Sequence, residues 1–272
     1  MNNAVEREAF ISHTIDALLE AETQLPRDVR NALTSAIKAE TNKRAKEQLQ
    51  AILKNAELAA AASLPMCQDT GVPVFFLEIG RESSIGFSLK EALATAVQRA
   101  TDLIPLRKHA VDPLTRANSD APLFDILYDV CDGDELSVAV LIKGAGSENA
   151  SALAMLEPTQ DVMSFILNTI WESGGKPCPP VIVGLGIGST FDGCARLAKK
   201  TLFRSLKEKE SAFEIEILEN INKLGIGPMG LGGRTTALRV FVEKAPCHTA
   251  MLPVAVAVQC WADRKAHFRM KL

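Results

Sequence analysis

The first 62 residues constrain the fold more than any other part of this sequence. Residues 4–62 are rich in Ala, Leu, Glu, Lys and Arg, which favour helices, and they contain no glycine. Pro26 interrupts this stretch and Pro65 follows it. Because proline ends or breaks a helix, the pattern predicts a helical N-terminal layer over residues 1–62, broken at Pro26.

Strand and helix signals alternate through residues 63–272. Short apolar runs predict strands at 72–80, 124–130, 136–142, 181–185, 236–243 and 252–259. Helical spacing predicts helices at 88–104, 159–173, 190–206 and 211–223. A Cys-Asp-Gly-Asp turn predicts that the second and third strands form a hairpin. We therefore expect one continuous domain of the mixed α/β class over residues 1–272, in which helices flank mixed sheets.

Charge and hydropathy exclude several classes of protein. The net charge is -3, and Lys and Arg are scattered instead of forming the basic stripe that binds nucleic acid. The apolar stretches are too short or too interrupted to span a bilayer, and no basic segment leads into an apolar run at the N-terminus. We expect a cytoplasmic protein with neither nucleic-acid nor membrane partners.

The cysteines suggest metal ligands more than disulfides. Six are dispersed through the chain without a close-spaced framework, and we expect no signal peptide. Three lie at the edge of a predicted strand or glycine-rich turn: Cys67 in Cys-Gln-Asp-Thr-Gly, Cys178 in Cys-Pro-Pro, and Cys260 in Cys-Trp-Ala-Asp-Arg. Three thiols could hold one iron–sulfur cluster and leave one iron open for substrate.

Two glycine-rich segments have alternative interpretations. The segment 143–147, Lys-Gly-Ala-Gly-Ser, follows a strand, so its backbone N–H groups could bind a carboxylate; a plain turn is the alternative. The segment 184–188, Gly-Leu-Gly-Ile-Gly, also follows a strand and opens a helix, which suggests a dinucleotide loop. The acidic strand end that a Rossmann fold needs is not found downstream. A nicotinamide-dependent dehydrogenase is thus a distant alternative.

The motifs CQDTG, KGAGS, CPP, GPMGLGGRTT and VAVQCWADR, in this order, resemble the iron–sulfur hydro-lyase family of class I fumarases and L-tartrate dehydratases. The resemblance extends from about residue 5 to the end and matches the alpha subunit of the two-subunit enzymes. It implies a 4Fe-4S cluster, oxygen-labile, held by Cys67, Cys178 and Cys260. The iron without a cysteine ligand is expected to bind the hydroxyl and a carboxylate of a small dicarboxylate.

The resemblance also points to residues that act on the substrate. Asp69 lies two residues beyond Cys67 and is the candidate proton-transfer residue or orienter of substrate oxygen. The alternative is that Asp69 only caps its turn. Candidate contacts to substrate carboxylates are Gln68, Thr70, Arg107 and the backbone of Gly144, Ala145 and Gly146.

The function expected from the resemblance is hydration or dehydration of a C4 dicarboxylate. Fumarate to malate is the favoured reaction, and L-tartrate to oxaloacetate is the alternative. Further binding and base residues are expected from a beta subunit, so we expect the isolated chain to be catalytically incomplete and the enzyme to be a dimer of alpha–beta pairs.

The remaining cysteines and histidines leave other classes open. Cys131 and Cys194 are interpreted as structural, whereas Cys247 beside His248 could form a nucleophile and base pair, and His248 could lie near the cluster. A zinc-stabilised binding protein is another alternative, although the close C-x-x-C spacing typical of zinc sites is absent. His109 has no context that distinguishes it.

Overall fold

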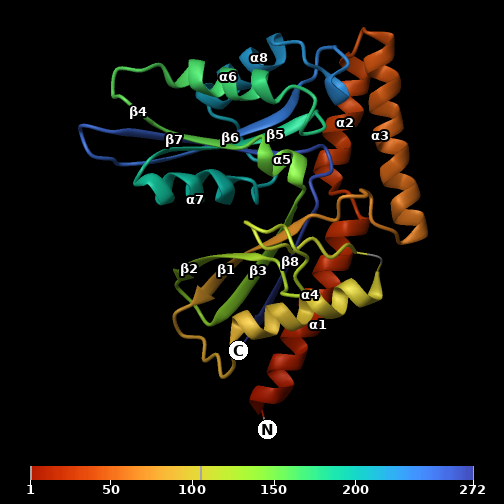
Figure 1. Ribbon diagram of the computed structural model, residues 1–272, viewed down its shortest axis with the longest axis vertical. Coiled ribbons are helices and arrows are strands. Elements are labelled where there is room, and N and C mark those ends of the chain that lie inside the picture. Colours follow the sequence, from red (N-terminus) through yellow and green to blue (C-terminus); the bar gives the residue numbers. More distant parts are fainter. Residues whose placement is uncertain (1, 105, 272) are drawn as a thin grey trace. The chain divides into compact units, whose positions relative to one another are not determined.

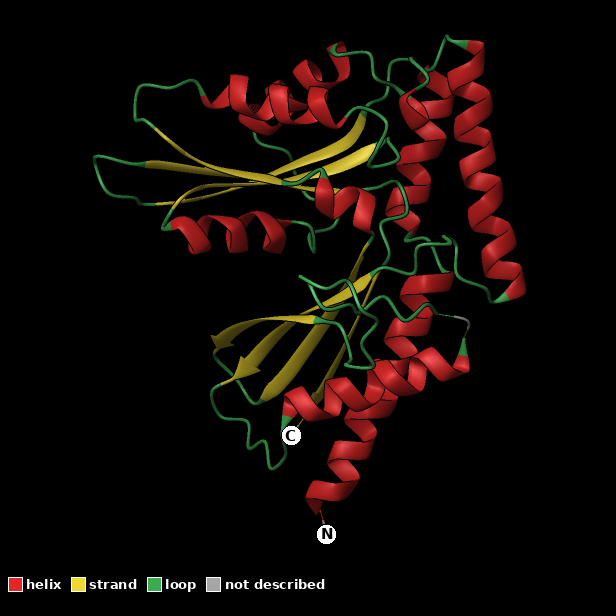
Figure 2. Cartoon of the chain, in the orientation of Figure 1, coloured by secondary structure: helices red, strands yellow, loops and turns green. Residues whose placement is uncertain are grey.

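The computed structural model describes residues 2–104 and 106–271 (Figure 1). The chain divides into two compact units, each assembled from segments distant in sequence. Unit 1 comprises Met1–Leu25, Leu58–Lys143 and Arg264–Leu272, and unit 2 comprises Pro26–Glu57 and Gly144–Asp263. Helices and strands are mixed throughout, which confirms the α/β class (Figure 2).

The N-terminal residues form helices as expected, with a second break after Glu40 that was not predicted. Helices α1 (Asn2–Thr23), α2 (Arg27–Ala39) and α3 (Lys43–Ala62) are separated at Pro26 and after Glu40. Helix α1 belongs to unit 1, α2 belongs to unit 2, and α3 begins in unit 2 and ends in unit 1. Helix α1 packs on the sheet of unit 1 and α2 contacts β6 of unit 2, so residues 1–62 contribute helices to both units. The single continuous domain over residues 1–272 stays a prediction.

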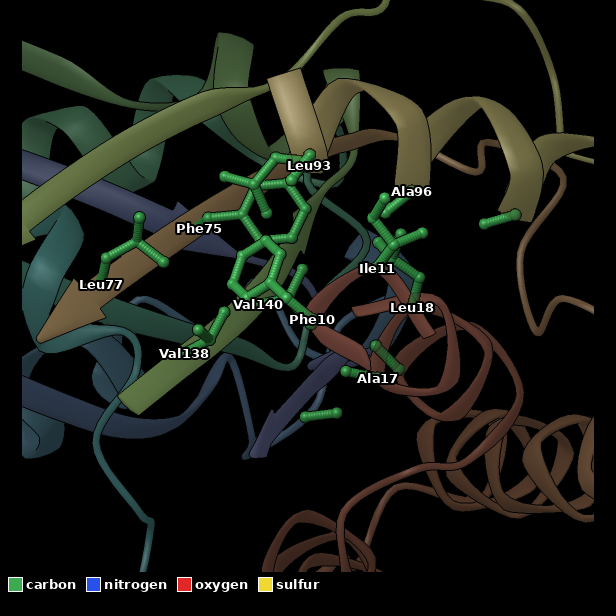
Figure 3. Close-up of a cluster of buried hydrophobic side chains, with 14 of the residues drawn as sticks. Phe10, Ile11, Ala17, Leu18, Phe75, Leu77, Leu93, Ala96, Val138 and Val140 are labelled. Carbon is green, nitrogen blue, oxygen red and sulfur yellow. The ribbon is translucent and has the colours of Figure 1, made fainter. Parts of the chain in front are cut away.

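Unit 1 is a four-stranded sheet with the order β2-β1-β3-β8. Its strands are β1 (Val72–Gly80), β2 (Asp125–Cys131), β3 (Glu135–Lys143) and β8 (Lys265–Lys271). Helices α1 and α4 (Leu89–Leu103) cover one face of this sheet (Figure 1). Buried side chains from both helices meet strand residues there, among them Phe10, Leu18, Phe75 and Leu93 (Figure 3). This core fixes the end of α1 against the sheet.

The predicted hairpin between the second and third strands is wrong. Strand β1 lies between them, paired parallel with β2 and antiparallel with β3. Residues 74–77 of β1 are all buried, so this strand takes a central position, where both faces are covered. In contrast, Tyr128 and Val130 of β2 are exposed, as suits an edge strand.

Unit 2 is a second four-stranded sheet with the order β4-β7-β5-β6. Its strands are β4 (Ala152–Leu156), β5 (Val181–Gly188), β6 (Ala237–Ala245) and β7 (Leu252–Gln259). Helices α6 (Val162–Ser173) and α8 (Ala212–Lys223) lie on one face and α7 (Phe191–Thr201) on the other (Figure 1). The short helices α5 (Ala145–Asn149) and η1 (Pro228–Gly230) lie in its loops. Strands β4 and β8 are additions to the sequence prediction.

Side-chain caps explain why α7 and α8 begin where the sequence predicts. The Thr190 hydroxyl accepts a hydrogen bond from the Gly193 N–H at 3.3 Å. Ser211 and Glu214 form a capping box at the start of α8. Such caps satisfy N–H groups that have no partner inside the helix. Helix α7 ends at Thr201, before the expected residue 206.

The glycines of residues 184–188 belong to strand β5 and do not form a dinucleotide loop. A Cβ on Gly186 would lie 2.1 Å from the Cys194 carbonyl oxygen of α7. A Cβ on Gly184 would lie 2.4 Å from the Ala198 carbonyl oxygen. These glycines therefore permit close helix-to-sheet packing, which removes the only feature that suggested a nicotinamide cofactor. No helix within the described ranges is both long enough and apolar enough to cross a membrane.

Candidate active site

The Cys67 loop in unit 1 connects α3 to the central strand β1, as the sequence predicts. The Cys67 thiol is half-buried. One residue earlier, the Met66 N–H donates to the Glu22 carbonyl oxygen at 2.9 Å, which ties the loop to the last turn of α1. The loop is thus attached to a helix that the core of unit 1 holds in place.

Gly71 ends this loop in a conformation that requires glycine. Its φ is +65°, in the left-handed region that favours glycine. A Cβ at this position would lie 2.6 Å from the Lys143 carbonyl oxygen at the end of β3. The loop therefore comes into backbone contact with β3 directly after the Asp69-Thr70 pair.

Asp69 caps its own turn and also faces a histidine. Its Oδ1 accepts a hydrogen bond from the Gly71 N–H at 3.0 Å, which confirms the turn-capping alternative. The same oxygen lies 3.6 Å from His109 Nε2, and the side chains are 32% and 28% exposed, respectively. Because the carboxylate remains partly accessible, the cap leaves room for a role in proton transfer.

Arg107 and His109 both contact Thr70. The Thr70 hydroxyl accepts a hydrogen bond from the Arg107 N–H at 2.9 Å, and it lies 3.2 Å from His109 Nε2. The structure thus brings Asp69, Thr70 and Arg107 together and adds His109. The only signal in the sequence for His109 is its position two residues after Arg107.

A pocket of about 60 Å³ in unit 1 opens beside these residues and is lined by Glu22, Thr70, Arg107, Lys108 and His109. Arg107 adds a positive charge to this lining, whereas Lys108 Nζ is paired with Asp120 Oδ1 at 3.6 Å. Burial raises the pKa of Glu22 to about 7, although the Arg264 guanidinium beside it favours the carboxylate form. Gln68 is exposed on the same loop as Asp69.

In unit 2, the backbone brings the loops of Cys178 and Cys260 together. The Trp261 N–H, next to Cys260, lies 3.4 Å from the Cys178 carbonyl oxygen and donates to it. Cys178 has φ +55°, and the following Pro179-Pro180 peptide bond is cis. Both thiols are half-buried. These two predicted ligands thus lie on adjoining segments.

Two further segments of unit 2 pack on the Cys178 turn. The Met229 N–H, in the glycine-dense loop, donates to the Pro179 carbonyl oxygen at 2.8 Å. A Cβ on Gly146 would lie 2.7 Å from the Lys176 carbonyl oxygen. The Gly144–Gly146 segment, which begins the one-turn helix α5, is therefore beside the Cys178 turn, in place of the plain turn considered above.

The other three cysteines differ from these three in exposure. Cys194 is fully buried, its thiol donates to the Gly186 carbonyl oxygen at 3.1 Å, and burial raises its pKa to about 11. A thiol in this state is a poor metal ligand because the thiolate binds metal. Cys131 and Cys247 are exposed, so the interpretation of Cys131 as a structural cysteine has no support from burial.

The donor chemistry of Cys67, Cys178 and Cys260 fits an iron–sulfur cluster. All three are reduced thiols in irregular segments, and thiolate is the ligand that such clusters use. Cys67 belongs to unit 1, whereas Cys178 and Cys260 belong to unit 2. Across residues 2–104 and 106–271, no group of three or more His, Cys, Asp or Glu side chains is gathered around a possible metal position.

Comparisons with known proteins identify the family. The family model described as "Fumarate hydratase (Fumerase)" matches residues 11–269. The putative L(+)-tartrate dehydratase subunit alpha of Methanocaldococcus jannaschii is 46% identical over 274 residues, covering 95% of this chain and 96% of that protein. The L(+)-tartrate dehydratase subunit alpha of Escherichia coli (strain UTI89 / UPEC) is 31% identical over 261 residues, covering 91% and 86%, respectively. This chain therefore belongs to the fumarate hydratase (Fumerase) family.

Proposed function

We propose that this chain is the alpha subunit of an iron–sulfur hydro-lyase that adds or removes water at a C4 dicarboxylate. The observation that carries the proposal is the hydrogen-bonded pairing of the Cys178 and Cys260 segments in a member of the fumarate hydratase family. Cys67, on a loop that also presents Asp69, would complete a three-thiolate ligand set for a 4Fe-4S cluster. When bound, such a cluster supplies one iron without a cysteine ligand as a Lewis acid toward the substrate hydroxyl and carboxylate.

Asp69 is the proposed proton-transfer residue. Its carboxylate is held by the Gly71 N–H and lies beside His109, so its orientation is set before substrate binds. A carboxylate in this position can accept a proton from the substrate or orient the departing water. His109 is the partner that would share or relay that proton.

The substrate carboxylates need donors, and this chain offers several. The exposed Arg107 guanidinium can bind a carboxylate through two parallel N–H groups. Gln68 and Thr70 are on the same loop as Asp69, and the N–H groups of Gly144, Ala145 and Gly146 lie beside the Cys178 turn. These six residues are the proposed substrate contacts.

The substrate is proposed to be fumarate/malate or L-tartrate. The family description favours fumarate/malate, and the names of the two relatives above favour L(+)-tartrate. Those names also specify a subunit alpha, so we propose that a separate beta subunit completes the site, in a dimer of alpha–beta pairs. A reducing cytoplasm would suit both the thiols and an oxygen-labile cluster.

The deciding experiment is anaerobic reconstitution with iron and sulfide. Wild type is expected to take up about four irons and four sulfides per chain, as a 4Fe-4S cluster requires. Cys67→Ser, Cys178→Ser and Cys260→Ser should each lose the cluster and its visible absorption, while Cys131→Ser, an exposed thiol, should keep both. A colourless wild type, or a cluster that is indifferent to the three substitutions, would remove the basis of the proposal.

The substrate is then distinguished with the partner subunit present. Malate dehydration is followed by the absorbance of fumarate, and tartrate dehydration by the appearance of oxaloacetate. The larger kcat/KM identifies the substrate. The cluster-loaded chain alone is expected to turn over neither compound, and robust turnover without a partner would contradict the two-subunit assignment.

A further inference from the structure

A buried ion pair lies under the Cys67 loop and has no role in the function proposed above. Glu22 and Arg264 are 1% and 0% exposed, and Arg264 Nη1 donates to Glu22 Oε2 at 3.0 Å. Removing both charges from water costs free energy that their attraction often does not recover. A buried ion pair is therefore weak evidence that the pair stabilises the fold. The contacts that Glu22 and Arg264 make with other residues suggest another role.

The contacts of the pair lie on both sides of Cys67. Arg264 Nη1 also donates to the Asp69 carbonyl oxygen at 2.8 Å, two residues after Cys67. The Glu22 carbonyl oxygen accepts from the Met66 N–H at 2.9 Å, one residue before Cys67. A single guanidinium nitrogen thus links the Glu22 carboxylate to the Asp69 carbonyl, on the C-terminal side of Cys67. The Glu22 carbonyl holds the Met66 N–H on the N-terminal side.

The pair is itself anchored to rigid elements of unit 1. Glu22 lies in the last turn of α1, whose buried side chains Phe10, Ile11 and Leu18 pack in the core of this unit (Figure 3). The Arg264 carbonyl oxygen accepts from the Ile142 N–H of β3 at 2.9 Å. The Cys67 loop is therefore linked through this pair to α1, which packs in the core, and to the central strand β3.

We infer that Glu22 and Arg264 are positioning residues that fix Cys67 as a cluster ligand and Asp69 as the proton-transfer group. This inference rests on the proposed function for what the loop does, but the contacts that restrain the loop are independent of it. Neither side chain is assigned a contact with substrate. Charge-assisted hydrogen bonds to a main-chain carbonyl in a buried site are strong enough to restrict a loop that has no regular structure.

Unit 2 supplies a matched control. Arg239 is 6% exposed, its Nη1 lies 2.8 Å from Glu210 Oε1, and its Nη2 donates to the Glu208 carbonyl oxygen at 2.6 Å. It therefore also links a carboxylate to a main-chain carbonyl, but the segment that it holds carries none of the proposed ligands. A change at Arg239 tests what loss of such a link does to the fold alone.

The test is site-resolved hydrogen exchange of the cluster-free full chain, with Glu22→Gln, Arg264→Lys and Arg239→Lys compared with wild type. Glu22→Gln keeps the shape and the backbone contact to Met66, so this variant should fold. We expect amides of residues 66–71 to exchange about tenfold faster or more in Glu22→Gln and Arg264→Lys, because a charged hydrogen bond is weakened. Amides around Cys178 and Cys260 should keep their wild-type rates, and Arg239→Lys should leave residues 66–71 unchanged.

Iron loading and kinetics extend the test to the reaction. The Glu22 and Arg264 variants should load less iron than Arg239→Lys, and with the partner subunit they should lower kcat more than they change KM. Equal exchange in wild type and both variants, or a uniform increase along the chain, would overturn the inference. If wild type loads no cluster, the proposed function fails, whereas the exchange rates still decide whether the pair positions the loop.

Discussion

The loops of Cys67 and Cys178 are held by different kinds of interaction. In unit 1, the Cys67 loop has one backbone bond, from Met66, and is also held by charged side chains, since Arg264 donates to the Asp69 carbonyl oxygen and to Glu22. In unit 2, the Cys178 turn depends on backbone groups, which come from Met229 and Trp261. Two loops proposed to bind one cluster can therefore respond to different mutations and to different changes of pH and salt.

This difference follows from how far the local backbone restricts each cysteine. Cys178 sits in a left-handed conformation next to two prolines, so the local backbone already restricts the thiol. Cys67 is followed by Gln-Asp-Thr-Gly, which has no proline to restrict it. External side chains must therefore supply the restriction in unit 1, and they bring a dependence on charge.

The largest expected effect is the loss of the cation in unit 1. Arg264→Met leaves Glu22 buried without the guanidinium, and above pH 7, where Glu22 is ionised, we expect a decrease of about 3–5 kcal/mol in the free energy of unfolding. Arg239→Met in unit 2 should cost less, about 1–3 kcal/mol, because the Glu210 side chain is 31% exposed and can be solvated. Chemical denaturation measures both values, and equal losses would break the comparison.

Replacement of Gly71 tests the backbone contact at the end of the Cys67 loop. Gly71→Ala combines a left-handed φ with a Cβ 2.6 Å from the Lys143 carbonyl oxygen, so we expect a loss of about 2–4 kcal/mol. Gly225→Ala has nearly the same φ, +68°, with no atom within 4 Å of the added Cβ, and should cost about 1–2 kcal/mol. Thermal unfolding measures both losses, and their difference is the steric cost of the added Cβ at residue 71. Equal unfolding temperatures of the two variants would show that this steric cost is absent.

The ion pair of unit 1 should also make stability depend on pH. Burial raises the pKa of Glu22 from 4.5 to about 7, so the folded chain holds this proton more tightly than the unfolded chain. Stability should therefore fall as the pH rises from about 4.5 to about 7, by roughly 3 kcal/mol from this group. Glu22→Gln should flatten the fall in denaturation curves recorded across this window, and an unchanged slope would contradict the assignment.

The smallest effect is expected at the backbone-held turn. Met229 supports the Cys178 turn through its N–H, which every residue except proline retains. Met229→Ala should therefore change the free energy of unfolding by less than about 1 kcal/mol and leave iron loading unaltered. A loss as large as that of Arg264→Met would show that the side chain, and not the backbone, holds the turn.

Local sequence patterns predicted most helices and strands but not which strands pair with each other. Strand β1 was expected at residues 72–80 and is found there, because a run of Val, Phe and Leu signals a strand without reference to the rest of the chain. The hairpin expected between the next two strands was wrong, because β1 lies between them and pairs with both. Strand β8 carried a usable signal: Ala266, Phe268 and Met270 alternate toward the core.

The sequence predicted site residues that lie in or near the recognised motifs, and it missed those outside them. Asp69 was singled out from its distance to Cys67, and the structure confirms its turn cap and adds its contact with His109. Glu22 could not be found, because it lies 45 residues before Cys67 in a helix whose other charged residues look similar. The roles of the six proposed substrate contacts stay predictions.

Local patterns predicted the α/β class, the starts of α4, α7 and α8 to within a residue, the loop positions of the three cysteines and, through the ordered motifs, the family. These features depend on neighbouring residues, such as caps, prolines and apolar runs, whose effects act within a few positions. Only the tertiary structure decided the strand order, the two units and the burial of Glu22 against Arg264. The physical reason is that pairing between distant segments is selected by total burial and by compensation of buried charge, and no short stretch of sequence encodes either quantity.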